Sequence, residues 1–150
     1  MYFCKTNQKI MGRYYTGDIE GKFWFGVQSS DDANHFGGSE IEIQDEETQE
    51  VYELEYHFTK EDLGVINSGL ENCKEEIGKE RLQKVEAYFG PGGNGENGYN
   101  PTEMAKEFGF TDSKDSEYIY MMELYARIGL GEKIKKCVED NGECHFSAEL

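Results

Sequence analysis

The segment Gly12–Gln28, GRYYTGDIEGKFWFGVQ, constrains the fold more than any other part of the chain. Its two aromatic, β-favouring runs flank a charged, glycine-containing turn, Asp18 to Lys22, which is typical of a tight hairpin. A two-stranded ribbon is not stable alone in water, so later segments must supply the surface on which it packs. We therefore expect the rest of the chain to be arranged around this aromatic hairpin, which contains Arg13, Tyr15 and Trp24.

A second hairpin is indicated by alternating residues between Glu40 and Phe58. Apolar and acidic residues alternate on both runs, and a polar turn, Asp45 to Glu50, separates them. Period-two alternation predicts strands with one buried and one solvated face. We expect Tyr52, Leu54, Tyr56 and Phe58 to be buried, and an acidic face, the glutamate ladder, to consist of Glu40, Glu42, Glu53 and Glu55. Ten acids and one lysine lie between Glu40 and Asp62.

Helical signals dominate the second half of the chain. A capping box at Thr59–Asp62 precedes apolar residues at helical spacing, which predicts one helix over about 60–89, with a bend or break at Ser68-Gly69. Residues 90–100 form a flexible glycine-rich loop, and Asn100, Pro101 and Glu103 predict a short helix to about residue 108. A third helix is expected over about 115–139, followed by a strand over 143–150 placed inside the sheet beside the aromatic hairpin.

These elements predict a single α+β domain over residues 1–150. The expected architecture is an antiparallel sheet of four to five strands with two long amphipathic helices packed on one face. Residues 1–10 are expected to form an arm or an additional edge strand.

The chain is strongly acidic. Its 150 residues include 15 Lys and Arg against 31 Asp and Glu, a formal net charge of -16. Such a charge repels nucleic acids and anionic membranes and attracts basic partners. No apolar run has membrane-spanning length and no signal peptide is recognised, so we expect a soluble cytoplasmic protein with reduced cysteines.

No cofactor or metal site is predicted. The four cysteines form no CxxC pair, and His35, His57 and His145 are scattered in the sequence. The glycine-rich loop is not followed by G-K-[ST], the pattern of phosphate-binding loops, so it is interpreted as a surface connection.

One catalytic alternative comes from the hairpin turn. Glu20 and Lys22, with Asp18 close by, have the spacing of the carboxylate and lysine pair of metal-dependent nucleases. In such a site a further acid, here Glu40 or Asp31, would complete the set of metal ligands. Plain turn chemistry explains the same residues. The net charge of -16 also disfavours a nucleic-acid substrate.

The run MGRYYTGDIEGKFWFGVQSSDDANHFG and the ending CHFSAEL resemble small uncharacterised acidic proteins encoded by large DNA viruses of algae and protists and by related environmental viral sequences. The resemblance implies a viral product, made in a host cytoplasm or packaged in a particle. It brings no activity with it.

The combined expectation is a non-enzymatic interaction protein. It would bind a basic host or capsid protein through the glutamate ladder and the aromatic hairpin (Arg13, Tyr15, Asp18, Glu20, Lys22 and Trp24). Two alternatives stay open: a small metal-dependent hydrolase or nuclease using Asp18, Glu20 and Lys22, and a minor structural protein of a virus particle.

Overall fold

The computed structural model describes residues 13–24 and 26–150, and its strands form one antiparallel sheet. The expected arm at residues 1–10 therefore lies outside the described residues. The strands lie in the order β2-β1-β5-β4-β3. Their bounds are β1 (Tyr14–Gly17), β2 (Gly21–Lys22), β3 (Ser39–Gln44), β4 (Val51–Thr59) and β5 (Glu143–Glu149). The α+β class and the antiparallel sheet of four to five strands predicted from the sequence are confirmed, and the sheet has five strands.

The last strand in sequence is the central strand of the sheet. β5 pairs with β1 on one side and with β4 on the other, so the prediction that it lies inside the sheet beside the aromatic hairpin is confirmed. Cys144, Phe146 and Ala148 alternate along it and are buried on the side that faces the helices. Phe146 stacks against Phe58 of β4, with a ring-centroid distance of 6.2 Å.

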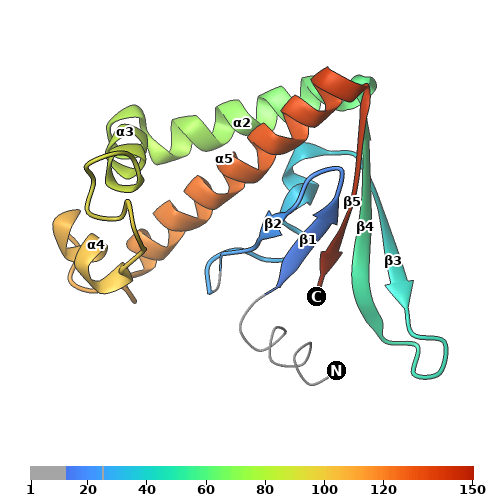
Figure 1. Ribbon diagram of the computed structural model, residues 1–150, viewed down its shortest axis with the longest axis horizontal. Helices are drawn as coiled ribbons and strands as arrows, with labels where there is room; N and C mark the ends of the chain where they lie inside the picture. Colours follow the sequence, from blue (N-terminus) through green and yellow to red (C-terminus); the bar gives the residue numbers. More distant parts are fainter. Residues whose placement is uncertain (1–12, 25) are drawn as a thin grey trace.

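The two long helices lie on one side of this sheet (Figure 1). α5 packs directly on β4 and β5, and α2 packs beside α5. Ile134 and Val138 of α5 and Ile66 of α2 have no exposed side-chain surface. The helical segments are η1 (Asp32–Phe36), η2 (Lys60–Asp62), α2 (Leu63–Ile77), α3 (Lys79–Phe89), α4 (Pro101–Glu107) and α5 (Ser116–Asn141). Figure 1 shows α3 and α4 at the end of the molecule away from the sheet.

The expected single helix over 60–89 is interrupted at Gly78 and not at Ser68-Gly69. Gly78 has φ 87° and ψ 145°, a conformation that non-glycine residues rarely adopt, so it ends α2 and lets α3 begin in a new direction. Gly69 serves close packing instead. A Cβ atom at this position would lie 2.8 Å from the carbonyl oxygen of His35, so the missing side chain lets η1 approach α2.

The helix starts predicted at Thr59 and at Asn100 are confirmed. Thr59 and Asp62 form a reciprocal capping box, with the Thr59 amide donating to the Asp62 carboxylate at 2.8 Å. Asn100 accepts a hydrogen bond from the amide of Glu103, and Pro101 occupies the first turn of α4. Each cap satisfies backbone amides that have no partner within the helix.

The second strand of the aromatic hairpin is shorter than its sequence predicts. β2 has only two residues, and the chain beyond it turns into the core instead of continuing as a strand. Phe23 is buried against Tyr15, with ring centroids 5.1 Å apart. Trp24 is half-buried and makes edge-on contacts with the rings of Phe89, Tyr99 and Tyr125. The hairpin thus joins the sheet to the distal helices, as expected of a segment around which the chain is organised.

A buried ion pair fixes η1 to α5. Asp32 is 1% exposed and accepts hydrogen bonds from Arg127 Nε at 2.8 Å and from the Gln28 side-chain amide at 2.9 Å. Buried charges persist in proteins when paired and hydrogen-bonded in this way. The pair therefore sets the position of the segment that leads from the aromatic hairpin to β3.

Candidate functional site

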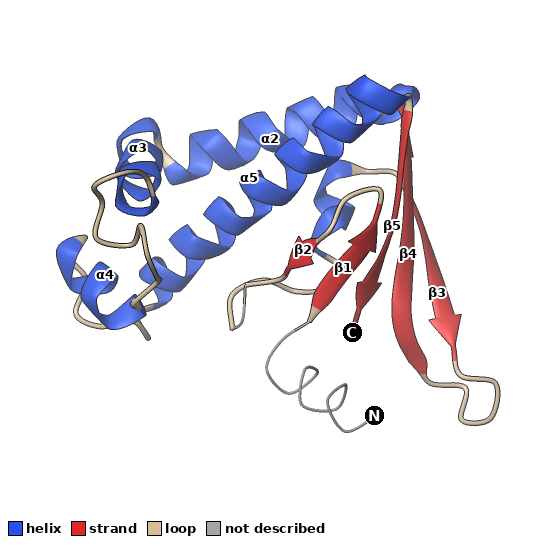
Figure 2. Ribbon diagram, in the orientation of Figure 1, coloured by secondary structure: helices blue, strands red, loops and turns tan. Residues whose placement is uncertain are grey.

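The side of β3, β4 and β5 turned away from the helices is here called the outer face. Figure 2 shows the helices gathered on the other side of the sheet. Alternation and register place these side chains on the outer face: Ile41, Ile43, Glu53, Glu55, His57, Glu143, His145, Ser147 and Glu149. The outer face contains four acids and two histidines but no lysine or arginine.

The predicted glutamate ladder does not form, because its four residues are divided between the two sides of the sheet. Glu40 pairs with Tyr56 and Glu42 with Leu54, so both glutamates lie on the core side, whereas Glu53 and Glu55 lie on the outer face. Residues directly opposite each other in an antiparallel pair share a face. Ile41, which belongs to the apolar set of the alternating first run, is on the outer face and 59% exposed.

The reason for this reversal is the edge position of β3. The helices cover β4 and β5, so apolar residues of β3 would gain little burial by turning toward them. Inward-pointing charges also discourage a sheet edge from pairing with another chain. Glu40 accepts hydrogen bonds from the Tyr56 hydroxyl at 2.6 Å and from the Asn34 amide at 2.9 Å. Burial and then the bond to Glu40 raise the pKa of Tyr56, which keeps its hydroxyl protonated as the donor.

Burial along β4 follows the prediction at three of four positions. Leu54, Tyr56 and Phe58 are buried, whereas Tyr52 is 53% exposed because it lies near the start of the strand, beyond the helices. Glu55 is exposed and Glu53 is half-buried. The acidic part of the outer face therefore consists of Glu53 and Glu55 from β4 with Glu143 and Glu149 from β5.

These carboxylates lie close together, and most of them have no cationic partner in the part of the chain that the structure describes. Glu53 lies directly opposite Glu149, and like charges in that position destabilise a sheet. Glu149 accepts a hydrogen bond from the Tyr14 amide at 3.0 Å. Within residues 13–24 and 26–150, neither Glu53, Glu55 nor Glu149 forms an ion pair. The outer face thus presents unneutralised negative charge to its surroundings.

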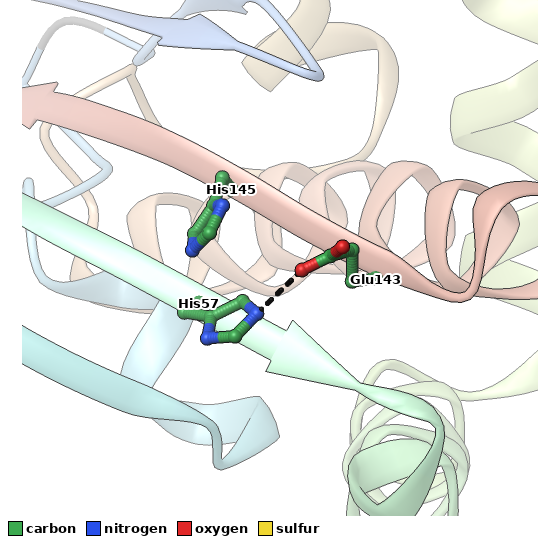
Figure 3. A group of neighbouring side chains, drawn as sticks. All are labelled: His57, Glu143 and His145. Atoms are coloured by element: carbon green, nitrogen blue, oxygen red, sulfur yellow. Dashed lines mark hydrogen bonds and ion pairs between the residues drawn. The ribbon is translucent and has the colours of Figure 1, made fainter.

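A histidine pair lies at one end of the outer face (Figure 3). His57 of β4 and His145 of β5 are directly opposite, with ring centroids 3.8 Å apart and planes inclined by 31°. Glu143, two residues before His145 on β5, places Oε1 2.9 Å from His57 Nε2. One ligand atom from each of the three residues lies within 4.8 Å of the others.

Sequence reasoning missed this cluster because its residues are far apart in the chain. A signal was present, however. Glu55-Tyr-His57 and Glu143-Cys-His145 are both Glu-x-His sequences on amphipathic strands, and this spacing puts each glutamate and histidine on one face. Only the pairing of β4 with β5 shows that the two histidines meet.

The hairpin residues predicted to bind a partner have packing roles. Tyr15 is buried, and its hydroxyl accepts a hydrogen bond from Lys133 Nζ at 2.8 Å. Arg13 is half-buried, donates to Ser30 Oγ at 2.7 Å and lies 5.4 Å from the Phe23 ring centroid. Trp24 is enclosed by aromatic rings as described above. The aromatic hairpin therefore does not offer these three side chains as a separate docking surface.

The Asp18, Glu20 and Lys22 arrangement does not assemble a nuclease-like site. Asp18 accepts a hydrogen bond from the backbone amide of His145 at 2.9 Å, Glu20 is exposed before β2, and Lys22 lies over the Tyr14 ring. Among the described residues, neither Asp18 nor Glu20 belongs to a trio of potential ligands, so the further acid expected from Glu40 or Asp31 is not supplied.

Comparison with known proteins gives no relative from which a role could be transferred. No family model, curated protein or solved structure matches the chain. No helix in the described part of the chain has both the length and the apolar character needed to cross a membrane.

Proposed function

We propose that this chain is a non-enzymatic interaction protein that binds a lysine- and arginine-rich segment of a protein partner on its outer face. The observation that carries the proposal is that three of the four outer-face carboxylates have no neutralising partner among the described residues. Glu53, Glu55 and Glu149 form no ion pair within residues 13–24 and 26–150, and no Lys or Arg occupies an outer-face position of β3, β4 or β5.

The composition of the outer face suits a basic partner in two ways. Carboxylates from adjacent strands repel one another in the free protein. Ammonium or guanidinium groups of a bound partner would reduce this electrostatic repulsion. Ile41 and Ile43 are opposite Glu55 and Glu53 and supply apolar surface beside the charges. Lysine and arginine stems pack on such surface while their charged ends reach the carboxylates.

The viral resemblance of the sequence supports a host or capsid protein as the source of the basic segment. A capsid partner would make the chain a minor structural protein of a virus particle, and a host partner would place it in the host cytoplasm. The metal-dependent nuclease alternative has less support, because Asp18 and Glu20 gather no third ligand among the described residues.

The test is binding of a fluorescent Lys/Arg-rich peptide, measured by anisotropy over a range of salt concentrations. The variant Glu53→Gln/Glu55→Gln/Glu149→Gln removes three outer-face charges and keeps side-chain shape, including the acceptor for the Tyr14 amide. At about 0.5 kcal/mol for each exposed charge pair, the variant should bind roughly tenfold more weakly. Binding should also weaken as salt rises, because exposed charges are screened.

The matched control is Glu71→Gln/Glu75→Gln/Glu80→Gln. These three glutamates are exposed on α2 and α3, away from the sheet, so the control has the same net charge as the test variant. It should bind the peptide as the parent does. Equal weakening in both variants would mean that only net charge matters, and the proposed docking face would be wrong.

A further inference from the structure

We propose that His57, Glu143 and His145 form a binding site for one divalent transition-metal ion of the Zn²⁺ class. The inference goes beyond the proposed partner binding and does not depend on it. Figure 3 shows the two imidazole rings and the carboxylate lying next to one another on neighbouring strands. Their potential ligand atoms all lie within 4.8 Å of one another.

The fold fixes this arrangement through strand register. Glu143 and His145 are separated by one residue on β5, so their side chains leave the same face of the sheet. His57 is directly opposite His145 on β4. All three Cα positions therefore belong to two paired strands at the centre of the sheet, and the site is built on rigid backbone and not on a loop.

The donor set determines the type of metal. Two imidazole nitrogens and one carboxylate oxygen suit Zn²⁺ and its neighbours, whereas Ca²⁺ and Mg²⁺ prefer oxygen ligands. With metal–ligand distances of about 2.0–2.2 Å, tetrahedral ligand atoms lie about 3.3–3.6 Å apart. The imidazole rings are inclined by 31°, so side-chain rotations must turn their nitrogen lone pairs toward one ion. The ion then takes the place of the hydrogen between His57 Nε2 and Glu143 Oε1, now 2.9 Å apart, and His57 binds as a neutral imidazole with its ring hydrogen on Nδ1.

The surroundings of the histidine pair favour a cation. A surface hollow of about 390 Å³ lies beside His145, and Asp18 and Glu55 line it together with Ser147. Their carboxylates raise the local concentration of cations. Three protein ligands leave one tetrahedral position open for a water molecule or a further ligand. Asp18 also holds the His145 backbone amide at 2.9 Å, which supports the ligand-bearing strand.

Isothermal titration of the full chain with ZnCl₂ tests the site. We expect one ion per chain, and a loss of affinity of at least about 100-fold in each of His57→Gln, Glu143→Gln and His145→Gln, more than the 10–100-fold typical of changing an outer-shell partner. His35→Gln is the matched control. His35 is exposed on η1, outside the cluster, so this variant should bind Zn²⁺ as the parent does.

A second readout separates this site from zinc binding by cysteine thiols. Co²⁺ is paramagnetic, so its binding should shift or broaden the imidazole NMR signals of His57 and His145 and leave those of His35 unchanged. Unaltered Zn²⁺ affinity in the three cluster variants would overturn the proposal. So would Co²⁺ effects centred on other residues, or no binding at millimolar Zn²⁺.

Discussion

Replacement of Arg127 by Met should destabilise the protein strongly, because it removes the cation that is hydrogen-bonded to the buried carboxylate of Asp32. Asp32 is 1% exposed, and Arg127 Nε lies 2.8 Å from its Oδ1. After the substitution, among the residues that the structure describes, the Gln28 side-chain amide still donates to Oδ2 at 2.9 Å, and the ring of the exposed His35 places Nε2 3.9 Å from Oδ1. Breaking a buried pair by removing one partner typically costs about 3–5 kcal/mol. We expect a loss of that size in the free energy of unfolding.

The reciprocal variant, Asp32→Asn, should cost less. Asparagine keeps the size of the side chain and an oxygen that can accept from Arg127. The guanidinium also has a second partner, with Nη2 3.6 Å from Glu123 Oε2. A loss of about 1–3 kcal/mol is expected, the cost of weakening a buried hydrogen bond. The double variant Asp32→Asn/Arg127→Met removes both charges and should be less destabilised than the sum of the single variants.

Urea denaturation followed by circular dichroism measures all four proteins. The midpoints should move while the slopes stay constant, which would show that stability has changed and that the denatured state has not. The coupling between the two substitutions is expected at about 0.5–3 kcal/mol. A loss below about 1 kcal/mol in the free energy of unfolding of Arg127→Met would refute the reasoning, because burying an unpaired carboxylate costs more than that.

Further changes test the register, the helix break and a buried tyrosine. Leu54→Ala should cost about 2–5 kcal/mol in urea denaturation, whereas Tyr52→Ala should cost less than about 0.5 kcal/mol; equal costs would contradict the observed burial along β4. Gly78→Ala should cost at least about 1 kcal/mol, because φ is 87°, whereas Gly64→Ala, in α2 with no atom near its Cβ, should stabilise by about 0.5–1 kcal/mol. The raised pKa of Tyr56 means that the folded chain keeps a proton that the unfolded chain loses above its ordinary pKa of 10.0. Stability should therefore fall as pH rises above that value, and less so in Tyr56→Phe, as thermal unfolding at several alkaline pH values would show.

Local signals were enough to predict much of the fold. The capping box at Thr59, the proline start of α4 and the amphipathic closing strand each depend on residues within a few positions of one another. Such interactions are visible in the sequence because their geometry is set by the backbone itself. The position of β5 inside the sheet was also predicted, because a strand with one apolar face must bury that face against the core.

The candidate site could not be predicted as fully, because it depends on which side of the sheet the helices cover. Alternation in β3 divides its side chains into an apolar set and an acidic set, but it does not tell which set faces the core. At this edge strand the usual orientation is reversed, so that Ile41 faces outward and Glu40 lies on the core side. The meeting of His57 with His145 depends on pairing between strands 88 positions apart along the chain. Register of this kind is set by the packed core and not by local sequence.

The most direct test of the central claim, that the outer face binds a basic partner segment, is an NMR titration of the ¹⁵N-labelled chain with the Lys/Arg-rich peptide. The account predicts that the amide shifts that change most are those of β4 and β5 around Glu53, Glu55 and Glu149, with Ile41 beside them. These changes should diminish as salt rises. Shifts concentrated in α3 and α4, or spread evenly over the acidic surface, would contradict it.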